Sequence, residues 1–308
     1  MQKVVVTGGA GFIGSTMSDR LIQEGFHVIV VDNLSTGNAK NINDHVEFHR
    51  EDLAEIDVDK LTKIFTGVDV VFHFAALARV QPSIEDPISF NTTNVQGTLK
   101  VLLAAHRAGV RRVVYSASSS AYGDAVEFPT PETHSTNPLS PYGLQKMIGE
   151  QYCKMFSEVY GLDTVSLRYF NVYGDRMSLE GAYCLVMGVF AKQLLNGQSL
   201  TITNDGNQRR DFTDVNDVVN ANWLAAFHPD PLNGEVFNIG NGQNYSVNEV
   251  ADMMGGEKTY GYPRIEPFET LADNTKARNI LGWHPTGDLP SWIEQYKKTL
   301  GISEKHTI

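Results

Sequence analysis

Three residues of this 308-residue chain could together move a proton: Ser118, Tyr142 and Lys146. Tyr142 and Lys146 are four positions apart, so on a helix they lie on one face, one turn apart. An ammonium held near a phenol favours the phenolate, and we therefore expect Tyr142 to titrate below its reference pKa of about 10. A phenolate can take a proton from a substrate hydroxyl, and Ser118, arriving from another element, could hydrogen-bond the same oxygen. Taken alone, the common Tyr-x-x-x-Lys spacing also fits a tyrosine that only packs at a helix start.

The chain begins with a pattern typical of dinucleotide binding. The motif Thr7-Gly8-Gly9-Ala10-Gly11-Phe12-Ile13-Gly14 lies between a predicted buried strand, residues 3–7, and a predicted helix, residues 11–24. Its glycines permit a tight turn, let a pyrophosphate approach the backbone, and let helix and strand pack closely. The start of the helix supplies free N–H groups and positive dipole. No Gly-Lys-Ser/Thr follows, so this is not the P-loop of a nucleotide hydrolase.

Asp32 indicates which dinucleotide is bound. It ends the second predicted strand, residues 27–32, and follows Gly11 by 21 residues. A carboxylate at this place binds ribose hydroxyls, and Asp32-Asn33 has no neighbouring arginine for a 2′-phosphate, so we expect NAD rather than NADP. Asp52-Leu53 follows the third predicted strand and could flank the adenine. Phe74-Ala75-Ala76 follows the fourth, and its small residues would let a cofactor lie against the backbone. Ordinary loop chemistry is the alternative for both segments.

Strands and helices alternate through the first half of the chain. Strands are predicted at residues 3–7, 27–32, 46–48, 68–74, 112–116 and 164–167, and helices at 11–24, 58–65, 88–108 and 142–160. This alternation specifies an α/β fold with a doubly wound parallel (Rossmann) sheet. After Asn171 glycines and prolines become frequent, and we expect a smaller mixed α/β lobe that closes over the carboxyl edge of the sheet. The expected division is a NAD-binding domain, 1–170, and a substrate-binding domain, 171–308, of which about 210–240 packs back on the first.

Composition excludes several classes of protein. The formal net charge is −11, which argues against a broad nucleic-acid or anionic-membrane surface. No signal peptide or spanning segment is expected, and the two cysteines read as buried thiols, so we expect a cytoplasmic protein. The stretch His45-Val46-Glu47-Phe48-His49 is interpreted as a solvated strand face, and no metal site is expected. An anionic substrate would need a local group of arginines.

With these residues placed, nearly the whole chain resembles the extended short-chain dehydrogenase/reductase family. Within that family it is similar to the NAD-dependent nucleotide-sugar 4-epimerases of the UDP-glucose 4-epimerase type. The motifs that carry the resemblance are Thr7 to Gly14, His73-Phe74-Ala75-Ala76, Asn94-Val95-Gln96-Gly97-Thr98, Ser118 to Gly123, the Tyr142/Lys146 pair, Arg168 to Gly174, Arg210-Asp211-Phe212 and Leu271-Ala272-Asp273.

The resemblance implies a function and a set of site residues. The function is 4-epimerisation of a UDP-hexose (UDP-glucose and UDP-galactose, with their N-acetylated forms as a further expectation) through a transient 4-keto intermediate. The implied catalytic residues are Ser118, Tyr142 and Lys146. The implied cofactor-binding residues are Gly8, Gly11, Phe12, Ile13, Gly14, Asp32, Asn33, Asp52, Leu53, Phe74, Ala75, Ala76, Asn94, Ser116, Tyr142, Lys146 and Phe170. The implied substrate-binding residues are Ser118, Asn171, Arg210, Arg264, Thr270 and Asp273.

The resemblance leaves alternatives. Dehydratases of the family typically carry Asp-Glu directly after the catalytic serine, and glucuronate decarboxylases carry Glu at the second position, whereas this chain has Ser119 and Ser120. Simple 4-epimerisation therefore leads. The alternatives are a UDP-glucuronate decarboxylase or epimerase, a 4,6-dehydratase, and a non-catalytic NAD-binding regulatory module, which would be expected to lose Tyr142 or Lys146. Surplus apolar positions in the helices starting near Ile88 and Tyr142 predict a homodimer.

Overall fold

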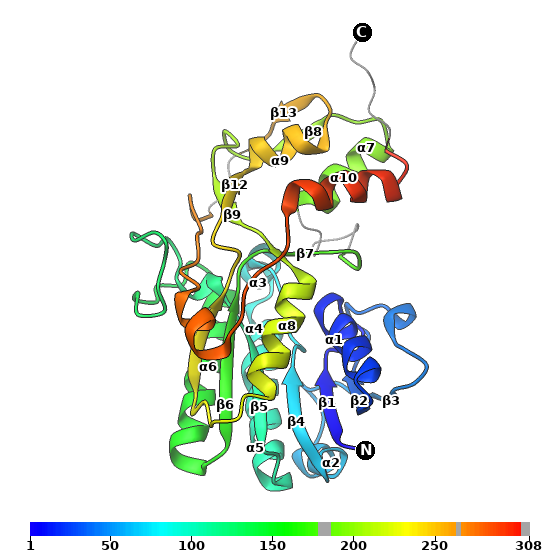
Figure 1. The fold of residues 1–308 in the computed structure, drawn as a ribbon, viewed down its shortest axis with the longest axis vertical. Coiled ribbons are helices and arrows are strands. Elements are labelled where there is room, and N and C mark those ends of the chain that lie inside the picture. Colours follow the sequence, from blue (N-terminus) through cyan, green and yellow to red (C-terminus); the bar gives the residue numbers. More distant parts are fainter. Residues whose placement is uncertain (178–185, 263–265, 303–308) are drawn as a thin grey trace.

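The computed structural model describes residues 1–177, 186–262 and 266–302. Its centre is a sheet of seven parallel strands in the order β11-β6-β5-β4-β1-β2-β3, as Figure 1 shows. The predicted doubly wound parallel sheet is therefore confirmed. The strands are β1 (Lys3–Thr7), β2 (His27–Asp32), β3 (Glu47–Arg50), β4 (Val68–His73), β5 (Arg112–Ser118), β6 (Asp163–Tyr169) and β11 (Glu235–Ile239).

Helices cover both faces of the sheet (Figure 1). Helices α1 (Phe12–Gln23) and α8 (Val215–Ala226) pack on one face, and α2 (Val58–Ile64), α5 (Gly97–Ala108) and α6 (Pro141–Tyr160) on the other. Val4 and Val6 of β1 lie in the first of these two cores and Val5 in the second. A strand that is buried on both sides reads as a continuous apolar run, which is why Val4-Val5-Val6 does not alternate with polar residues.

The helix that carries Tyr142 is delimited by its own sequence. The Ser140 hydroxyl accepts a hydrogen bond from the Gly143 N–H, and Pro141 occupies the first turn, where its missing N–H costs nothing. The helix ends at Gly161, whose φ of +68° is the left-handed conformation that favours glycine. These local signals fix where Tyr142 stands relative to the end of β5.

The helix expected from Ile88 to Ala108 is not one regular helix. It consists of α4 (Pro87–Asn91), a π-helical turn (Thr92–Gln96) and α5. A π-turn inserts an extra residue into a helix and is frequent at functional sites. Here it lets Asn94 turn inward, where it is 1% exposed.

The second half of the chain contributes to two places. Strand β11 pairs with β6 at the edge of the large sheet, an element that the sequence analysis did not predict. A smaller lobe with its own core stands at the carboxyl edge of the sheet (Figure 1). The remaining elements are η1 (Ala39–Asn41), α3 (Val80–Glu85), η3 (Ser119–Ala121), β7 (Val172–Tyr173), α7 (Val186–Leu195), β8 (Leu200–Ile202), β9 (Arg209–Asp211), β10 (Thr213–Asp214), β12 (Asn244–Ser246), α9 (Val247–Met254), β13 (Lys258–Tyr260), η4 (Ala277–Leu281) and α10 (Leu289–Thr299).

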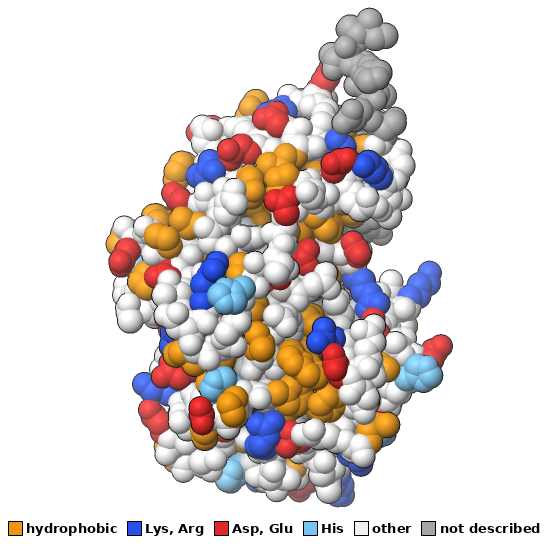
Figure 2. Space-filling model, in the orientation of Figure 1, with side chains coloured by type: hydrophobic (Ala, Val, Ile, Leu, Met, Phe, Trp, Pro, Cys, Tyr) orange, Lys and Arg blue, Asp and Glu red, His pale blue; other side chains and the backbone are white. Residues whose placement is uncertain are grey.

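Surface charge is mixed. On the face drawn in Figure 2, basic and acidic side chains are interspersed, without a broad basic patch. In the part of the chain that the structure describes, no helix is both long and apolar enough to cross a bilayer. Cys153 is a buried thiol, whereas Cys184 lies outside the described residues. Glu47 hydrogen-bonds His27 and His49, and no group of three or more His, Cys, Asp or Glu among the described residues is arranged as a metal site.

Candidate active site

The glycine motif forms a tight cradle between β1 and α1. Gly8 has a φ of +73°, and a Cβ there would lie 2.6 Å from the backbone nitrogen of Ala75. A Cβ on Gly14 would lie 2.2 Å from the Gly8 carbonyl oxygen, so only glycine permits this approach of helix and turn. No side chain caps the start of α1 at Gly11. The first N–H groups of the helix therefore remain available to an anion.

A pocket opens beside this cradle, and we call it the Asp32 pocket. It lies where β1, β2 and β4 end, the edge at which ligands bind in doubly wound sheets. Nine of the predicted cofactor residues line it: Gly8, Gly11, Asp32, Asn33, Asp52, Leu53, Phe74, Ala75 and Ala76. The other eight predicted cofactor residues, Phe12, Ile13, Gly14, Asn94, Ser116, Tyr142, Lys146 and Phe170, do not line this pocket. The side chain of Ile13 packs instead against the core between the sheet, α1 and α8. The side chain of Phe12 packs against the core of the smaller lobe.

The carboxylate of Asp32 is held in a fixed orientation. One oxygen accepts from the Ala10 N–H at 3.0 Å, and the other from the Leu34 N–H at 2.7 Å. Asn33 donates to Asp52 at 2.9 Å and joins the two polar segments of the pocket. Oriented carboxylates with spare lone pairs suit the two hydroxyls of a ribose. The Asp32 pocket therefore fits the adenosine half of NAD.

The three candidate catalytic residues meet where β5 ends and α6 begins. Ser118 is the last residue of β5 and is 8% exposed. Its side chain hydrogen-bonds Tyr142, and its hydroxyl also contacts that of Ser120 at 3.1 Å. Lys146 is 4% exposed and donates from Nζ to the Ser116 carbonyl at 2.7 Å. The predicted grouping of serine, tyrosine and lysine is thus present.

The expected lowering of the Tyr142 pKa is not found. Burial raises the pKa of Tyr142, and the Ser118 hydrogen bond and the positive charge of Arg79 only partly oppose this. Lys146 does not act on the phenol as predicted, because its ammonium points to Ser116 and lies 5.2 Å from the centroid of the Tyr115 ring. Burial lowers the pKa of Lys146 itself to about 8. Tyr142 and Lys146 thus share one face of the helix without the close contact between their polar groups that was predicted.

Arg79 was missed by the sequence analysis. It is a non-glycine residue with a φ of +96°, a sparsely populated conformation that surrounding structure must impose. It directly precedes α3, and its charge lowers the pKa of Tyr142. No sequence motif marks this residue, because its proximity to Tyr142 depends on how α3 packs against α6.

Asn94 works through neighbours that the sequence did not reveal. Its side chain accepts from the Leu77 N–H and donates to the Leu77 carbonyl, both at 2.8 Å, and donates to Gln145 at 3.0 Å. The loop after β4, which borders the Asp32 pocket, is thereby tied to α6. Asn94 therefore holds the backbone of this loop in place.

A second relay stiffens the same region. The Thr98 hydroxyl donates to the Asn94 carbonyl at 2.6 Å, so it accepts from Nε2 of His73 at 2.9 Å. Nδ1 of His73 then accepts from the Thr7 hydroxyl at 2.7 Å. Burial, with Lys146, lowers the His73 pKa to about 3, which keeps the ring neutral. Strands β1 and β4 and helix α5 are thus locked together under the site.

A second, smaller pocket lies beyond Ser118, and we call it the Thr270 pocket. Its lining comes from the segment after β5, the end of β6 and the segment before Ala272. The lining residues are Ser119, Tyr122, Gly123, Ala125, Thr130, Phe170, Glu269 and Thr270. Phe170 and Thr270, predicted for cofactor and substrate, lie here together. The Thr270 hydroxyl accepts from the Asn171 side chain at 3.3 Å and from the Asp211 N–H at 3.2 Å.

The remaining predicted substrate residues are dispersed. Arg210 pairs with Glu266 at 2.7 Å. The Asp273 carboxylate accepts from the Thr275 N–H within its own turn. Arg264 lies outside the described residues. The sequence analysis gave Asp211 no binding role, and the structure buries it fully. Its carboxylate accepts hydrogen bonds from the backbone N–H groups of Asn241, Gly242 and Ala272. Burial raises the pKa of this carboxyl group to about 6.

A dinucleotide cradle beside a Ser-Tyr-Lys group at the carboxyl edge of a parallel sheet defines an NAD-dependent enzyme of the short-chain dehydrogenase/reductase class. The model of the NAD dependent epimerase/dehydratase family matches residues 4–240, and the chain belongs to this family. The cofactor of the family is NAD, which agrees with the Asp32 pocket.

The chain is also similar over nearly its whole length to individual proteins. It is 38% identical to the UDP-glucose 4-epimerase of Mycolicibacterium smegmatis, covering 92% of this chain and 93% of that protein. Its structure is similar to that of the UDP-glucose 4-epimerase of Thermotoga maritima with UDP-glucose, with a TM-score of 0.91 and 38% identity over 97% of this chain and 100% of that one. It is also similar to the UDP-N-acetylglucosamine 4-epimerase of Methanobrevibacter ruminantium M1 in complex with UDP-N-acetylmuramic acid, with a TM-score of 0.90 and 36% identity over 98% and 97% of the two chains.

Proposed function

We propose that the protein is an NAD-dependent 4-epimerase of UDP-hexoses, acting on UDP-glucose and UDP-galactose through a transient 4-keto sugar. The observation that carries this proposal is the Ser118-Tyr142-Lys146 group beside the NAD cradle, with serine at both positions that follow Ser118. Elimination of water needs an additional acid and base, and the dehydratases and decarboxylases that the chain resembles carry a carboxylate after the serine, whereas Ser119 and Ser120 supply none. The names of the relatives support the same reaction.

Each residue of the group has a defined task in this proposal. Tyr142 removes the proton of the sugar 4-hydroxyl and later returns it, and Ser118 hydrogen-bonds the 4-oxygen in both states. Lys146 would bind the nicotinamide ribose, and the positive charge that favours the Tyr142 phenolate would come from Arg79 and from the oxidised nicotinamide. Bound NAD would supply a reversible hydride acceptor for C4. The 4-keto sugar turns in its pocket between the two transfers, so the overall reaction is redox-neutral.

The Thr270 pocket favours a neutral sugar. Its described lining contains no lysine, arginine or histidine and one carboxylate, that of Glu269. A hexuronate would bring a second carboxylate close to Glu269, and like charges at short range disfavour binding. This composition argues against the glucuronate alternatives and for a plain or N-acetylated hexose.

The substrate diphosphate needs cations, since the chain carries a net charge of −11. We assign Asn171, Arg210 and Arg264 to the diphosphate, because a guanidinium fork matches phosphate geometry. Asp273 is assigned to the substrate without a more specific role. This gives residues 1–170 the role of the NAD-binding domain and 171–308 that of the substrate-binding domain, with about 210–240 packing back on the first. We further propose that the enzyme works in the cytoplasm, where nucleotide sugars would be its substrates.

A panel of UDP-, dTDP- and GDP-sugars tests the proposed substrate class. The purified protein should convert UDP-glucose to UDP-galactose, read by chromatography of the products, and should leave the dTDP and GDP sugars largely unchanged. Water loss from any of them, or release of carbon dioxide from UDP-glucuronate, would replace the proposal with the dehydratase or decarboxylase alternative.

The identity of the cofactor gives a separate prediction. Asp32 should hydrogen-bond the adenosine ribose and repel a 2′-phosphate, so the dinucleotide extracted from the protein should have the mass of NAD. An Asp32→Ser variant should bind NADP better relative to NAD than wild type does. Recovery of NADP from the wild-type protein would contradict the assigned role of Asp32.

Thr270 is expected to admit N-acetylated sugars. The residue lines the Thr270 pocket, is small, and uses its oxygen as an acceptor, so its hydroxyl hydrogen is free to donate to an acetamide. Thr270→Tyr should fill the space next to the sugar C2 and lower kcat/KM for the UDP-N-acetylhexose pair by roughly 100-fold relative to the plain pair.

Thr270→Val is the matched control, because it keeps the volume and removes the hydroxyl. It should retain the N-acetylated pair with at most a modest loss. Equal losses on both sugar pairs in Thr270→Tyr, or no effect on either, would show that Thr270 does not select the substrate.

We also propose a two-fold homodimer, but the apolar residues available for its interface differ from those predicted from the sequence. Leu102, Cys153 and Phe156 are among the apolar positions that the sequence analysis treated as surplus, and they are buried in the core under α5 and α6. Exposed apolar residues in this region include Ile84 and Ile88, which precede the π-turn, and Leu144 near the start of α6, at 52, 78 and 45% exposure. Exposed large apolar side chains on packed neighbouring helices are typical of an interface.

Light scattering tests the dimer. The wild-type protein should have twice the mass of the chain at micromolar concentration, and Ile88→Glu should yield monomers because it would bury a charge in the interface. Val126→Glu is the control, since Val126 is 89% exposed and belongs to the loop after Gly123. A stable wild-type monomer would refute the proposal.

A further inference from the structure

A buried ion pair lies next to the catalytic group. Arg168 donates from Nε to Glu150 Oε1 at 2.9 Å and from Nη2 to Oε2 at 2.6 Å. The side chains of Glu150 and Arg168 are only 1 and 6% exposed. A buried ion pair is often no more stabilising than apolar side chains of the same volume. The location of the pair next to the catalytic residues, and not a gain in stability, therefore indicates its role.

Glu150 belongs to the helix of the proposed base. Tyr142, Lys146 and Glu150 follow one another at intervals of four residues on α6 and so share one face. Arg168 lies on β6, directly beside Ala117 of β5, one residue before Ser118. The ion pair thus fixes the catalytic face of α6 against the two strands that end at the site.

Arg168 has a second contact on the other side. Its guanidinium carbon lies 4.5 Å from the centroid of the Tyr122 ring. Tyr122 donates its hydroxyl to Asn238 at 2.7 Å and packs against Phe170, with ring centroids 6.3 Å apart. Tyr122 and Phe170 both line the Thr270 pocket. One guanidinium therefore connects the helix of the base with the lining of the proposed sugar site.

The pair also affects the charge of Lys146. Burial lowers the pKa of Lys146 to about 8, and the Glu150 carboxylate is the main group that raises it again. The other titratable groups around Lys146 are His73 on β4, Tyr115 on β5, and Tyr142 and Cys153 on α6, while Arg168 on β6 pairs with Glu150. Removal of Glu150 would take away the carboxylate that opposes the effect of burial on Lys146.

We propose that Glu150 and Arg168 are positioning residues of the reaction: their ion pair holds the catalytic face of α6 and the Tyr122 side of the Thr270 pocket in register, and the carboxylate keeps Lys146 protonated. The kinetic part of this inference rests on the proposed function of Tyr142 and Lys146. The charge coupling does not, because it can be read on the protein without substrate.

An NMR titration reads the charge coupling directly. Protein labelled with ¹³C at lysine Cε, with the Lys146 signal assigned by its loss in Lys146→Met, reports the protonation of that ammonium. Glu150→Gln should lower the Lys146 pKa, because the carboxylate that opposes the effect of burial is then lost. An unchanged Lys146 pKa in Glu150→Gln would overturn the proposed coupling.

The kinetics of the variants test whether the ion pair positions the catalytic face of α6. A protonated Lys146 is lost as pH rises through its pKa, so a lower pKa in Glu150→Gln should move the alkaline limb of activity to lower pH. Its kcat should fall by roughly 10- to 100-fold through misplacement of α6. Tyr122→Leu leaves the ion pair in place and should mainly raise KM for the UDP-hexose. This second variant keeps the proposal testable if Glu150→Gln does not fold.

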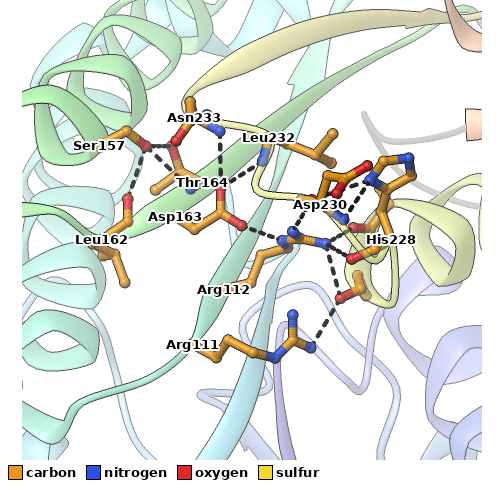
Figure 3. Close-up of polar contacts among 12 residues, drawn as sticks. Arg111, Arg112, Ser157, Leu162, Asp163, Thr164, His228, Asp230, Leu232 and Asn233 are labelled. Carbon is orange, nitrogen blue, oxygen red and sulfur yellow. Dashed lines mark hydrogen bonds and ion pairs between the residues drawn. The ribbon is translucent and has the colours of Figure 1, made fainter. Parts of the chain in front are cut away.

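The chain contains a matched control, the ion pair between buried Arg112 and partly buried Asp163, which lies at the amino ends of β5 and β6, away from the site (Figure 3). Asp163→Asn should lower the melting temperature and leave the alkaline limb and the Lys146 pKa unchanged. The proposal is overturned if Glu150→Gln behaves in the same way, losing stability alone. If Lys146 responds as expected but wild type epimerises no UDP-hexose, the proposed function fails while the charge coupling stands.

Discussion

Tyr142→Phe is expected to keep its NAD and to lose nearly all turnover. Tyr142 is the base that the site offers to a sugar 4-hydroxyl, and removal of a general base lowers kcat by roughly 10²- to 10⁴-fold. NAD should remain bound, because the Asp32 pocket and the glycine cradle do not include the phenol. Turnover of UDP-glucose and the dinucleotide released on denaturation are the two measurements.

Tyr152→Phe is the matched control for this experiment. Tyr152 lies on the same helix, packs against the core under α5 and α6, and should retain full activity as phenylalanine. A Tyr142→Phe protein within severalfold of wild type would show that another group removes the proton. Loss of NAD together with activity would instead indicate that Tyr142 serves mainly to hold the cofactor.

Arg112→Met is expected to cause the largest loss of stability. Arg112 is 2% exposed and donates to Asp163 and to the backbone carbonyls of Ala225, Ala226, His228 and Asp230 (Figure 3). It thereby satisfies carbonyls at the end of α8 that have no partner within the helix. Removal deprives Asp163 of its ion-pair partner and the carbonyls of Ala225, His228 and Asp230 of this donor, which costs about 3–5 kcal/mol of the free energy of unfolding.

Arg111→Met provides the comparison within the same dipeptide. Arg111 is 42% exposed, pairs with Asp69 at the surface and donates one hydrogen bond to the Ala226 carbonyl, so its loss should cost only about 1 kcal/mol. Urea unfolding of both variants measures the difference. Equal losses would mean that burial does not distinguish the two arginines and that Arg112 does not attach α8 to the sheet.

Sequence information was sufficient where the chemistry is local. The turn from Gly8 to Gly14 is predictable because its spacing is a known motif, and the closest contacts of Gly11 and Gly14 are with Gly8 in the motif itself. Ser140-Pro141 and Gly161 delimit α6 in the same way. The grouping of Ser118 with Tyr142 was implied by the family resemblance, and in the structure the end of β5 and the start of α6 bring the two residues together.

Tertiary packing decided what the sequence could not. Lys146 and Tyr142 share a helix face, but burial and the Ser116 carbonyl set the pKa of each, and neither is visible in a four-residue spacing. Arg111 and Arg112 are identical neighbours in sequence and opposite in burial. Strand β11 escaped prediction because its pairing with β6 is distant along the chain.

The fate of the hydrogen on C4 reports whether the sugar is transiently oxidised at that carbon. UDP-glucose carrying deuterium at C4 would be incubated with the purified protein in ordinary water, without added reductant or nucleotide, and the UDP-galactose analysed by mass spectrometry and NMR. We expect the deuterium to remain on C4 of the product, because the hydride leaves and returns within one site. Loss of the label to water, or no UDP-galactose at all, would contradict the transient oxidation.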